Sequence, residues 1–271
     1  MDRLAIVTAV NDEEILRNNL ARSPMIASGS VEIIVEYGHK SAAAALNRGI
    51  QRTSAELMIL VHQDVYLPGG WDAKLLCAAK GLRSAGESWG ALGVWGIKQN
   101  GGFAGRVWCT GSGREFAAPM VGVCEAVSID EIVIVLNRSG GLQFDEQLPG
   151  FHLYATDIVR QAHHRGLKAY VFDAPVVHNS RCNPNVYDRL YRSAYRYMQR
   201  KWREELPLPT CVAPITRYGH WDIRKRWLKA EIRRVLGHAN AGPRHQDPQK
   251  IAEQFGYEKA SIGAIANTHR I

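Results

Sequence analysis

The chain has 271 residues, a formal net charge of +8, 46% hydrophobic residues and 22% charged residues. These values are ordinary for a globular protein, and the length allows one large domain or a domain with an appendage. No apolar run reaches the roughly 20 residues that span a bilayer. The N-terminal stretch MDRLAIVTAVNDEE turns acidic where a signal peptide would stay apolar, so we expect a cytoplasmic protein.

The cysteines are odd in number and never form a CxxC pair, which argues against a disulfide framework and against a zinc knuckle. We therefore expect reduced thiols. The five positions are Cys77, Cys109, Cys124, Cys182 and Cys211.

The first 65 residues alternate between strand and helix patterns. Residues 3–10 and 31–37 are apolar and rich in β-branched residues, the Ala-rich stretch 41–53 is typical of a helix, and 55–65 predicts a third strand. This order indicates a parallel sheet covered by helices. Because ligands bind at the carboxyl ends of parallel strands, Asn11, Glu36 and Asp64 should meet in one crevice.

The remaining pattern predicts further strands and then basic helices. The stretch 99–113 contains five glycines and is expected to be a mobile loop, either a lid over the site or an irregular surface hairpin. From about residue 182, strand patterns disappear. The other expected elements are a helix at 71–82, a Gly-rich strand at 90–98, a strand pair or bent strand at 124–138, a helix at 157–166 capped by Gly166, and a strand at 168–175.

Three polar residues at strand or helix ends could carry chemistry, and each has a plainer alternative. Asp64, beside His62 and Gln63, could bind Mg²⁺ or Mn²⁺, or could serve only as a turn former before Pro68. Asp157 could act as a general base, or could only complement the helix dipole with Thr156 as cap. His178 follows the last strand and could be a ligand, or a hydrogen-bonded surface residue.

The combination of segments resembles a known family. Three segments are similar to GT-A-fold glycosyltransferases of the family 2 type, in particular to the subgroup similar to the streptomycin-biosynthesis StrF protein. They are the end of the first strand, LNRGIQRTSAELMILVHQDVYLPGGW, and FDEQLPGFHLYATDIVRQAHHRGLKAYVFDAPVVHNS. The resemblance covers about residues 3–181. It implies an α/β, GT-A (Rossmann-like) fold with a mixed, mostly parallel central sheet. We therefore expect a catalytic domain at 1–181 and a basic helical C-terminal extension at 182–271.

The resemblance also implies roles for individual residues. HQD occupies the place of the DxD motif, so Asp64 matches its last acid and His62 stands where the first acid is expected, which removes one carboxylate ligand. Asp157 matches the catalytic acid that deprotonates the acceptor, and His178 matches a late histidine that completes the metal site. Positions expected to bind the donor nucleotide are Thr8, Val10, Asn11, Glu36, Asn47, His62, Gln63 and Asp64, and positions expected at the acceptor are His152 and Tyr154.

The implied function is metal-assisted, inverting transfer of a sugar from a nucleotide diphosphate to a hydroxyl acceptor, such as a glycan, glycolipid or secondary metabolite. A divalent ion (Mn²⁺ or Mg²⁺) and a UDP- or dTDP-sugar would be required. An alternative is a GT-A-like module that binds nucleotide sugars without catalysis, which the HQD variant favours.

The C-terminal part is strongly basic and amphipathic. Residues 185–203 contain six basic residues and one acidic residue, Asp188. Residues 221–236 contain six more basic residues. The basic face could be only solvated surface, or it could contact an anionic membrane at its inner face, with Trp221 and Trp227 at the interface. A nucleic-acid-binding role would rest on charge alone, since no recognition motif accompanies it.

Overall fold

The computed structural model describes residues 2–118, 120–181, 185–236 and 246–258. Cys182 and the boundary between the two expected domains lie outside these ranges. Among the described residues, no helix combines the length and the apolar character needed to cross a membrane.

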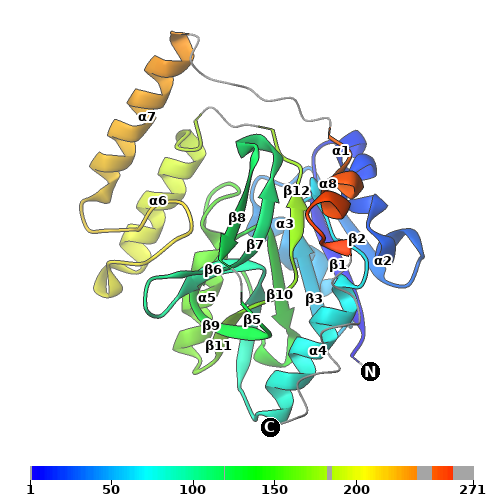
Figure 1. The fold of residues 1–271 in the computed structure, drawn as a ribbon. Helices are drawn as coiled ribbons and strands as arrows, with labels where there is room; N and C mark the ends of the chain where they lie inside the picture. Colours follow the sequence, from blue (N-terminus) through cyan, green and yellow to red (C-terminus); the bar gives the residue numbers. More distant parts are fainter. Residues whose placement is uncertain (1, 119, 182–184, 237–245, 259–271) are drawn as a thin grey trace.

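The described strands form one mixed sheet (Figure 1). Its strands are β1 (Leu4–Val10), β2 (Glu32–Tyr37), β3 (Leu57–Val61), β4 (Val65–Tyr66), β5 (Trp89–Gly93), β6 (Trp95–Lys98), β7 (Phe103–Cys109), β8 (Arg114–Ala118), β9 (Val123–Ile129), β10 (Val133–Asn137), β11 (Lys168–Phe172) and β12 (Val176–His178). The helices are α1 (Glu13–Asn18), α2 (Pro24–Ala27), α3 (Ala42–Gln51), α4 (Trp71–Ser84), α5 (Tyr154–His164), α6 (Arg189–Lys201), α7 (Gly219–Val235) and α8 (Pro248–Gln254).

The central part of the sheet has the order β2-β1-β3-β10-β5-β11. The strands β2, β1 and β3 are parallel, β10 is antiparallel to both of its neighbours, and β11 is parallel to β5. Only β10 therefore runs against the other strands of this part. The predicted α/β, Rossmann-like fold, with a mixed and mostly parallel central sheet and helices at the C-terminal end, is confirmed.

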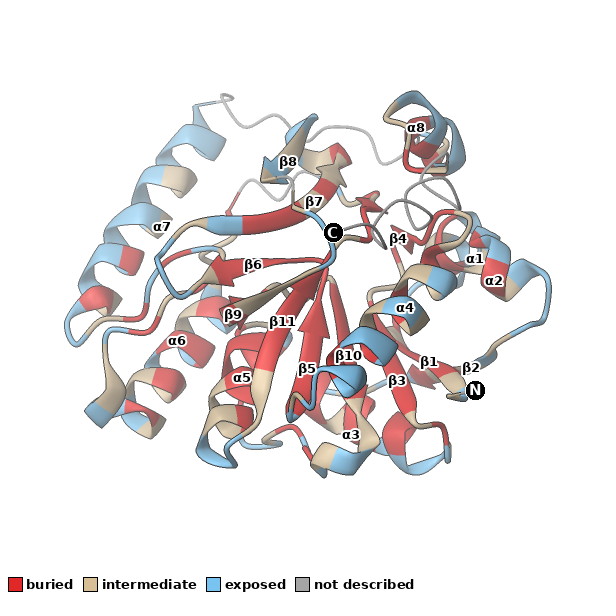
Figure 2. Ribbon diagram, turned by 60° about the horizontal axis from the view of Figure 1, so that its bottom comes forward, coloured by how far each residue is buried: buried red, intermediate tan, exposed pale blue. Residues whose placement is uncertain are grey.

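Apolar side chains alternate between the two faces of the central strands and build a core on each face. On one face, residues of α3, α5 and α6 pack against β1, β3 and β10, whereas residues of α1, α2 and α4 pack on the opposite face. Figure 2 shows the buried strands between these layers. Because Ile223 of α7 and four residues of α6 belong to the first core, the C-terminal helices share it with the sheet.

Two expectations for the middle of the chain are wrong. The stretch 90–98 is not one strand, because the chain breaks at Val94 and the two halves, β5 and β6, pair with different neighbours. The glycine-rich stretch 99–113 is not a continuous loop, because its seven central residues, Phe103–Cys109, form β7. One of its glycines serves close packing: a Cβ at Gly105, where φ is +102°, would lie 2.0 Å from the carbonyl oxygen of Val94.

The ends of two elements also differ from expectation. Helix α5 begins at Tyr154 rather than Asp157, and its N-cap is Leu153 with φ +66°, so Thr156 is not the cap. The third expected strand ends at Val61, which leaves Asp64 in the turn before β4. His178 lies on a short strand, β12, rather than in a turn.

Candidate functional site

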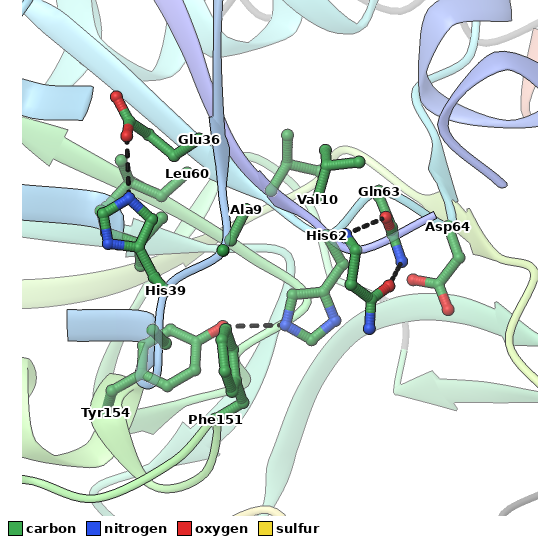
Figure 3. A pocket seen from close by; sticks show the side chains of 15 residues that line it. Ala9, Val10, Glu36, His39, Leu60, His62, Gln63, Asp64, Phe151 and Tyr154 are labelled. Atoms are coloured by element: carbon green, nitrogen blue, oxygen red, sulfur yellow. Dashed lines mark hydrogen bonds and ion pairs between the residues drawn. The ribbon is translucent and has the colours of Figure 1, made fainter. Parts of the chain in front are cut away.

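A cavity of about 350 Å³ opens at the carboxyl ends of β1, β2 and β3 (Figure 3). The sequence predicted that Asn11, Glu36 and Asp64 would meet at this edge of the sheet, because parallel strands bring their carboxyl ends together. Apolar side chains of α3 and β3 form part of the wall, and the ring of Phe151 closes another part. The lining residues are Ala9, Val10, Asn11, Glu36, Gly38, His39, Ala42, Leu46, Leu60, Val61, His62, Gln63, Asp64, Phe151 and Tyr154.

Gln63 joins the ends of β1 and β3. Its side-chain oxygen accepts hydrogen bonds from the backbone N–H groups of Asn11 at 3.1 Å and of Asp12 at 3.2 Å. Asp12 in turn caps α1 by accepting from the N–H groups of Glu14 and Ile15. These contacts fix the loop that forms one side of the cavity.

Glu36 provides a buried negative charge at the end of β2. Its carboxylate lies 2.7 Å from an Arg52 nitrogen and 2.9 Å from His39 Nε2. Burial raises the pKa of Glu36, but the hydrogen bonds from Arg52 and His39 outweigh it and lower the pKa below the ordinary value. Glu36 is therefore an ionised acceptor for hydroxyl or N–H donors of a ligand.

His62, Asp64 and His178 form a cluster that could hold a metal ion. One ligand atom from each of the three lies within 4.8 Å of the others, and Asp64 Oδ1 is 3.5 Å from His178 Nε2. Ligands bound to a common ion at about 2.1 Å are separated by about 3 to 4 Å, so small side-chain shifts would suffice. The strand β12 brings His178 here by pairing with β4, and the N–H of Asn179 donates to the Asp64 carbonyl at 2.8 Å.

Hydrogen bonds orient the His62 ring for ligation. The Tyr154 hydroxyl donates to the carbonyl of Glu131 at 3.2 Å, and it lies 2.8 Å from His62 Nε2. Burial lowers the pKa of His62 to about 4, so the ring is neutral near pH 7. Since Nε2 then donates to Tyr154, Nδ1 keeps its lone pair, as a metal-binding histidine requires.

His178 differs from His62 in its charge. Burial works against protonation, but Asp64 and Cys109 outweigh burial and raise the pKa of His178 to about 10. Burial raises the pKa of the Cys109 thiol, but the hydrogen bond and the charge of His178 outweigh burial and lower this pKa to about 6. Two imidazoles and one carboxylate fit a transition metal better than Mg²⁺, which prefers oxygen ligands.

Not all residues predicted for the donor site lie in the cavity. Val10, Asn11, Glu36, His62, Gln63 and Asp64 do, as does Tyr154, which was expected at the acceptor. Thr8 is fully buried in β1. Asn47 is held by Phe144, whose backbone N–H and C=O both bond the Asn47 amide at 2.9 Å, so it ties α3 to the segment before α5. His152 packs its ring against Tyr191 outside the cavity lining.

Asp157 does not line the cavity. It is 1% exposed, and its carboxylate accepts from Trp202 Nε1 at 2.8 Å, from Lys201 Nζ at 2.9 Å and from Gln161 at 2.7 Å. Trp202 and Lys201 belong to the end of α6, which covers the helix that carries Asp157. These contacts engage both oxygens of the carboxylate, and Asp157 is not among the residues that line the cavity.

Sequence reasoning missed several polar residues near the cluster. Asp130 and Glu131 follow β9, and burial raises the pKa of both carboxyls above their ordinary values. Glu131 accepts from the backbone N–H groups of Leu153 and Tyr154, and Asp130 is held by the N–H of Ile132 at 3.1 Å. An acid pair directly after a strand was the available signal, the same signal that identified Asp64. No comparable signal marked His39, which also lines the cavity.

The chain matches no protein-family model and no curated protein sequence. Solved structures similar to it include GalNAc-T7 with UDP, GalNAc and Mn²⁺, at 11% identity and a TM-score of 0.44, covering 89% of this chain and 58% of that one. The mannosyltransferase PcManGT from Pyrobaculum calidifontis, with GDP-Man and Mn²⁺, is 14% identical with a TM-score of 0.45 and covers 98% of this chain and 77% of that one.

A third similar structure is a mutant of Drosophila β-1,4-galactosyltransferase 7 with manganese, UDP-Gal and xylobiose, at 13% identity and a TM-score of 0.41. The match covers 71% of this chain and 74% of that one. This chain thus spans little more than half of GalNAc-T7. At such low identities and TM-scores, the likeness assigns no activity to this chain.

Proposed function

We propose that the chain is a glycosyltransferase that moves a sugar from a nucleotide diphosphate to a hydroxyl acceptor. The observation that carries the proposal is the cavity at the carboxyl ends of β1, β2 and β3, with the His62–Asp64–His178 cluster beside it. The apolar wall and Phe151 suit a flat base, and ionised Glu36 suits ribose or base donors. UDP- and dTDP-sugars remain the predicted donors, and the StrF-like subgroup remains a prediction.

The ligand set favours Mn²⁺ over Mg²⁺ because it contains two imidazoles. A divalent ion held by His62, Asp64 and His178 would supply positive charge toward the diphosphate leaving group. The residues of the chain position the donor: Gln63 and Asn11 hold the cavity loop, and Tyr154 fixes the His62 ring. A single inverting displacement then needs only a base for the acceptor hydroxyl.

Two positions for that base follow from different arguments. Asp157 is predicted by the resemblance, but its contacts with Trp202 and Lys201 favour a structural role. We propose Asp130 or Glu131 instead, because they lie beside the cluster and burial raises the pKa of both carboxyls, which makes each a stronger base than an exposed carboxylate. The predicted acceptor contact of His152 stays a proposal, as do the division at residues 181 and 182 and the cytoplasmic location.

The first experiment measures release of nucleoside diphosphate from a panel of nucleotide sugars, with and without Mn²⁺. We expect release from one donor, dependent on metal and abolished in Asp64→Asn, because the substitution weakens the cluster and leaves the cavity wall intact. Binding of the nucleotide diphosphate without release, in the presence of a panel of hydroxyl acceptors, would instead support the binding-module alternative. The absence of both binding and release would contradict the proposal.

A second experiment locates the base by comparing transfer rates of Asp130→Asn, Glu131→Gln and Asp157→Asn. A general base contributes about 10²–10⁴-fold, so the variant at the true position should lose that factor while keeping its affinity for the nucleotide. Trp202→Phe serves as control for Asp157, because it removes one hydrogen bond to that carboxylate and leaves the acid in place.

A further inference from the structure

Helix α7 (Gly219–Val235) has two faces of different character. Ile223 is buried, and Trp227 and Glu231 are partly buried: Arg192 of α6 lies 4.2 Å over the Trp227 ring, and Asn185, in the segment before α6, donates to Glu231 at 2.8 Å. Residues 223, 227 and 231 are spaced four apart, so they form one stripe of the helix. This stripe packs α7 onto the remainder of the protein.

A second apolar stripe, about 100° around α7 from the first, is covered by no described residue. Trp221, Leu228, Ile232 and Val235 recur at intervals of seven, four and three residues, which places them together on the helix surface, and they are 51% to 76% exposed. Half of the twelve large hydrophobic side chains exposed in the described part of the chain lie within 218–236. They therefore form a contiguous patch rather than the scattered exposure that is normal for a protein surface.

Basic residues border this outer stripe. The helix carries six basic side chains against two acidic ones, Asp222 and Glu231, and Glu231 is already paired with Arg234. On one side of the stripe, Lys225, Lys229 and Arg233 lie beside Leu228 and Ile232. In Figure 1, α7 lies at the outside of the molecule, beyond α6.

On the other side, a cavity of about 380 Å³ lies between α6 and α7. Arg224 follows Trp221 by three residues and precedes Leu228 by four, so the cavity adjoins the outer stripe. Four arginines and a histidine line it, and no carboxylate is among the lining residues, which suits the bidentate binding of a phosphate. The lining residues are Arg189, Arg192, Ser193, Tyr195, Arg196, His220, Ile223, Arg224 and Trp227.

We propose that α7 docks the protein onto an anionic phospholipid membrane. The outer stripe enters the boundary between headgroups and acyl chains, and the arginine cavity beside it takes a headgroup phosphate. One exposed face of the helix therefore carries an apolar stripe with basic side chains along its borders. This arrangement complements an anionic bilayer, which has an apolar interior and a negatively charged surface. Trp221 is exposed at this surface, and Trp227, which lies under Arg192, lines the arginine cavity beside it.

The test is co-sedimentation of the full chain with vesicles of phosphatidylcholine alone and with vesicles that also contain phosphatidylglycerol. We expect binding only to the anionic vesicles, and weaker binding at high salt. Arg196→Gln with Arg224→Gln should lower the affinity about 25-fold, since each basic residue near the surface contributes about fivefold. Leu228→Glu with Ile232→Glu should lower it more than about tenfold, because the stripe can no longer enter the bilayer.

Matched controls carry the same changes elsewhere. Arg17→Gln with Lys80→Gln removes two exposed charges outside α6 and α7, and Val121→Glu places an acid at an exposed apolar site in a loop. Both controls should bind vesicles as the unaltered chain does, and circular dichroism should show that every variant is folded. The assay contains no donor or acceptor, so its result is independent of the proposed glycosyl transfer.

Four outcomes would overturn the proposal. The chain could ignore anionic vesicles at low salt, or the controls could lose binding as much as the α7 variants. Inorganic phosphate binding that depends on Arg196 and Arg224, without any vesicle binding, would assign the cavity to a soluble anion. Self-association or binding to random DNA that the Leu228 and Ile232 changes abolish, again without vesicle binding, would assign the stripe to that partner.

Discussion

At the scale of single residues, the two histidines of the cluster are in opposite states of charge before any metal binds. His62 is neutral because burial lowers its pKa to about 4, whereas Asp64 and Cys109 keep His178 protonated up to a pKa of about 10. A metal ion must therefore displace a proton from His178 and none from His62. Because the charge of His178 also lowers the pKa of Cys109, the thiolate can take up the proton that His178 releases, so the pH dependence of metal affinity reports this pair.

In a Cys109→Ser background, which has no thiolate to take up the proton, we expect Mn²⁺ affinity to rise about tenfold per pH unit through the neutral range, because one proton is released from His178 per ion bound. Titration calorimetry in two buffers of different ionisation enthalpy counts that proton. His178→Gln should bind more weakly and lose most of the slope. Affinity that does not change with pH would contradict this assignment of charge.

Asp157 illustrates how far the surroundings of a residue decide its role. If it is structural, Asp157→Asn should lower the free energy of unfolding by about 1–3 kcal/mol, because Lys201 and Trp202 lose a charged acceptor. Trp202→Phe should cost about 1 kcal/mol by removing one hydrogen bond. Urea denaturation measures both. Unchanged stability of Asp157→Asn together with lost transfer would restore Asp157 as the base.

At the scale of elements, β7 shows why glycine content misled the prediction. Glycines are common in loops, but here one of them allows two strands to approach closely. Trp95 of β6 pairs with Gly105 of β7. Because φ of Gly105 is positive, a side chain at this position would point at the carbonyl oxygen of Val94. The composition of the stretch cannot distinguish these two uses of glycine.

Gly105→Ala should therefore lower the free energy of unfolding by more than about 3 kcal/mol, since both the backbone conformation and the space are unfavourable for a side chain. Gly101→Ala is the matched control: its φ is +83°, but nothing lies within 4 Å of the added Cβ. Gly101→Ala should lower the free energy of unfolding by only about 1 kcal/mol, because alanine disfavours a positive φ. Equal effects in chemical denaturation would show that packing between β6 and β7 is not the cause.

At the scale of the whole molecule, residues 246–258 return to the sheet beside the cluster. Helix α8 packs Ile251 against Tyr66 and Val177, next to His178 in β12. Glu258 accepts from the Tyr66 hydroxyl at 2.7 Å and from the Gly69 N–H at 2.6 Å, and Asn179 donates to the Gln246 carbonyl at 3.0 Å. This segment stabilises the strands that place His178.

Ile251→Ala should lower the free energy of unfolding by about 2–4 kcal/mol, because it leaves a cavity beneath α8. Lys250→Ala, on the exposed side of the same helix, should change it by less than about 0.5 kcal/mol. Thermal denaturation of the two variants gives the comparison. A small effect of Ile251→Ala would mean that α8 is not part of the cooperative fold.

The sequence by itself determined the first half of the sheet and the edge that carries the cavity. Short apolar runs alternating with helix patterns specify parallel strands, and parallel strands bring Asn11, Glu36 and Asp64 to one edge whatever follows in the chain. These features depend on local periodicity and on the order of the elements, and both can be read directly from the amino-acid sequence.

Only the tertiary structure decided which polar side chains reach that edge and which are covered. Asp157 and Asp64 looked equivalent in sequence, but the end of α6 packs over Asp157 and leaves Asp64 at the cavity. His178 joins Asp64 because β12 pairs with β4, over a hundred positions away in the chain. Contacts between distant segments decide the burial and the charge of a side chain, and local sequence patterns do not encode them.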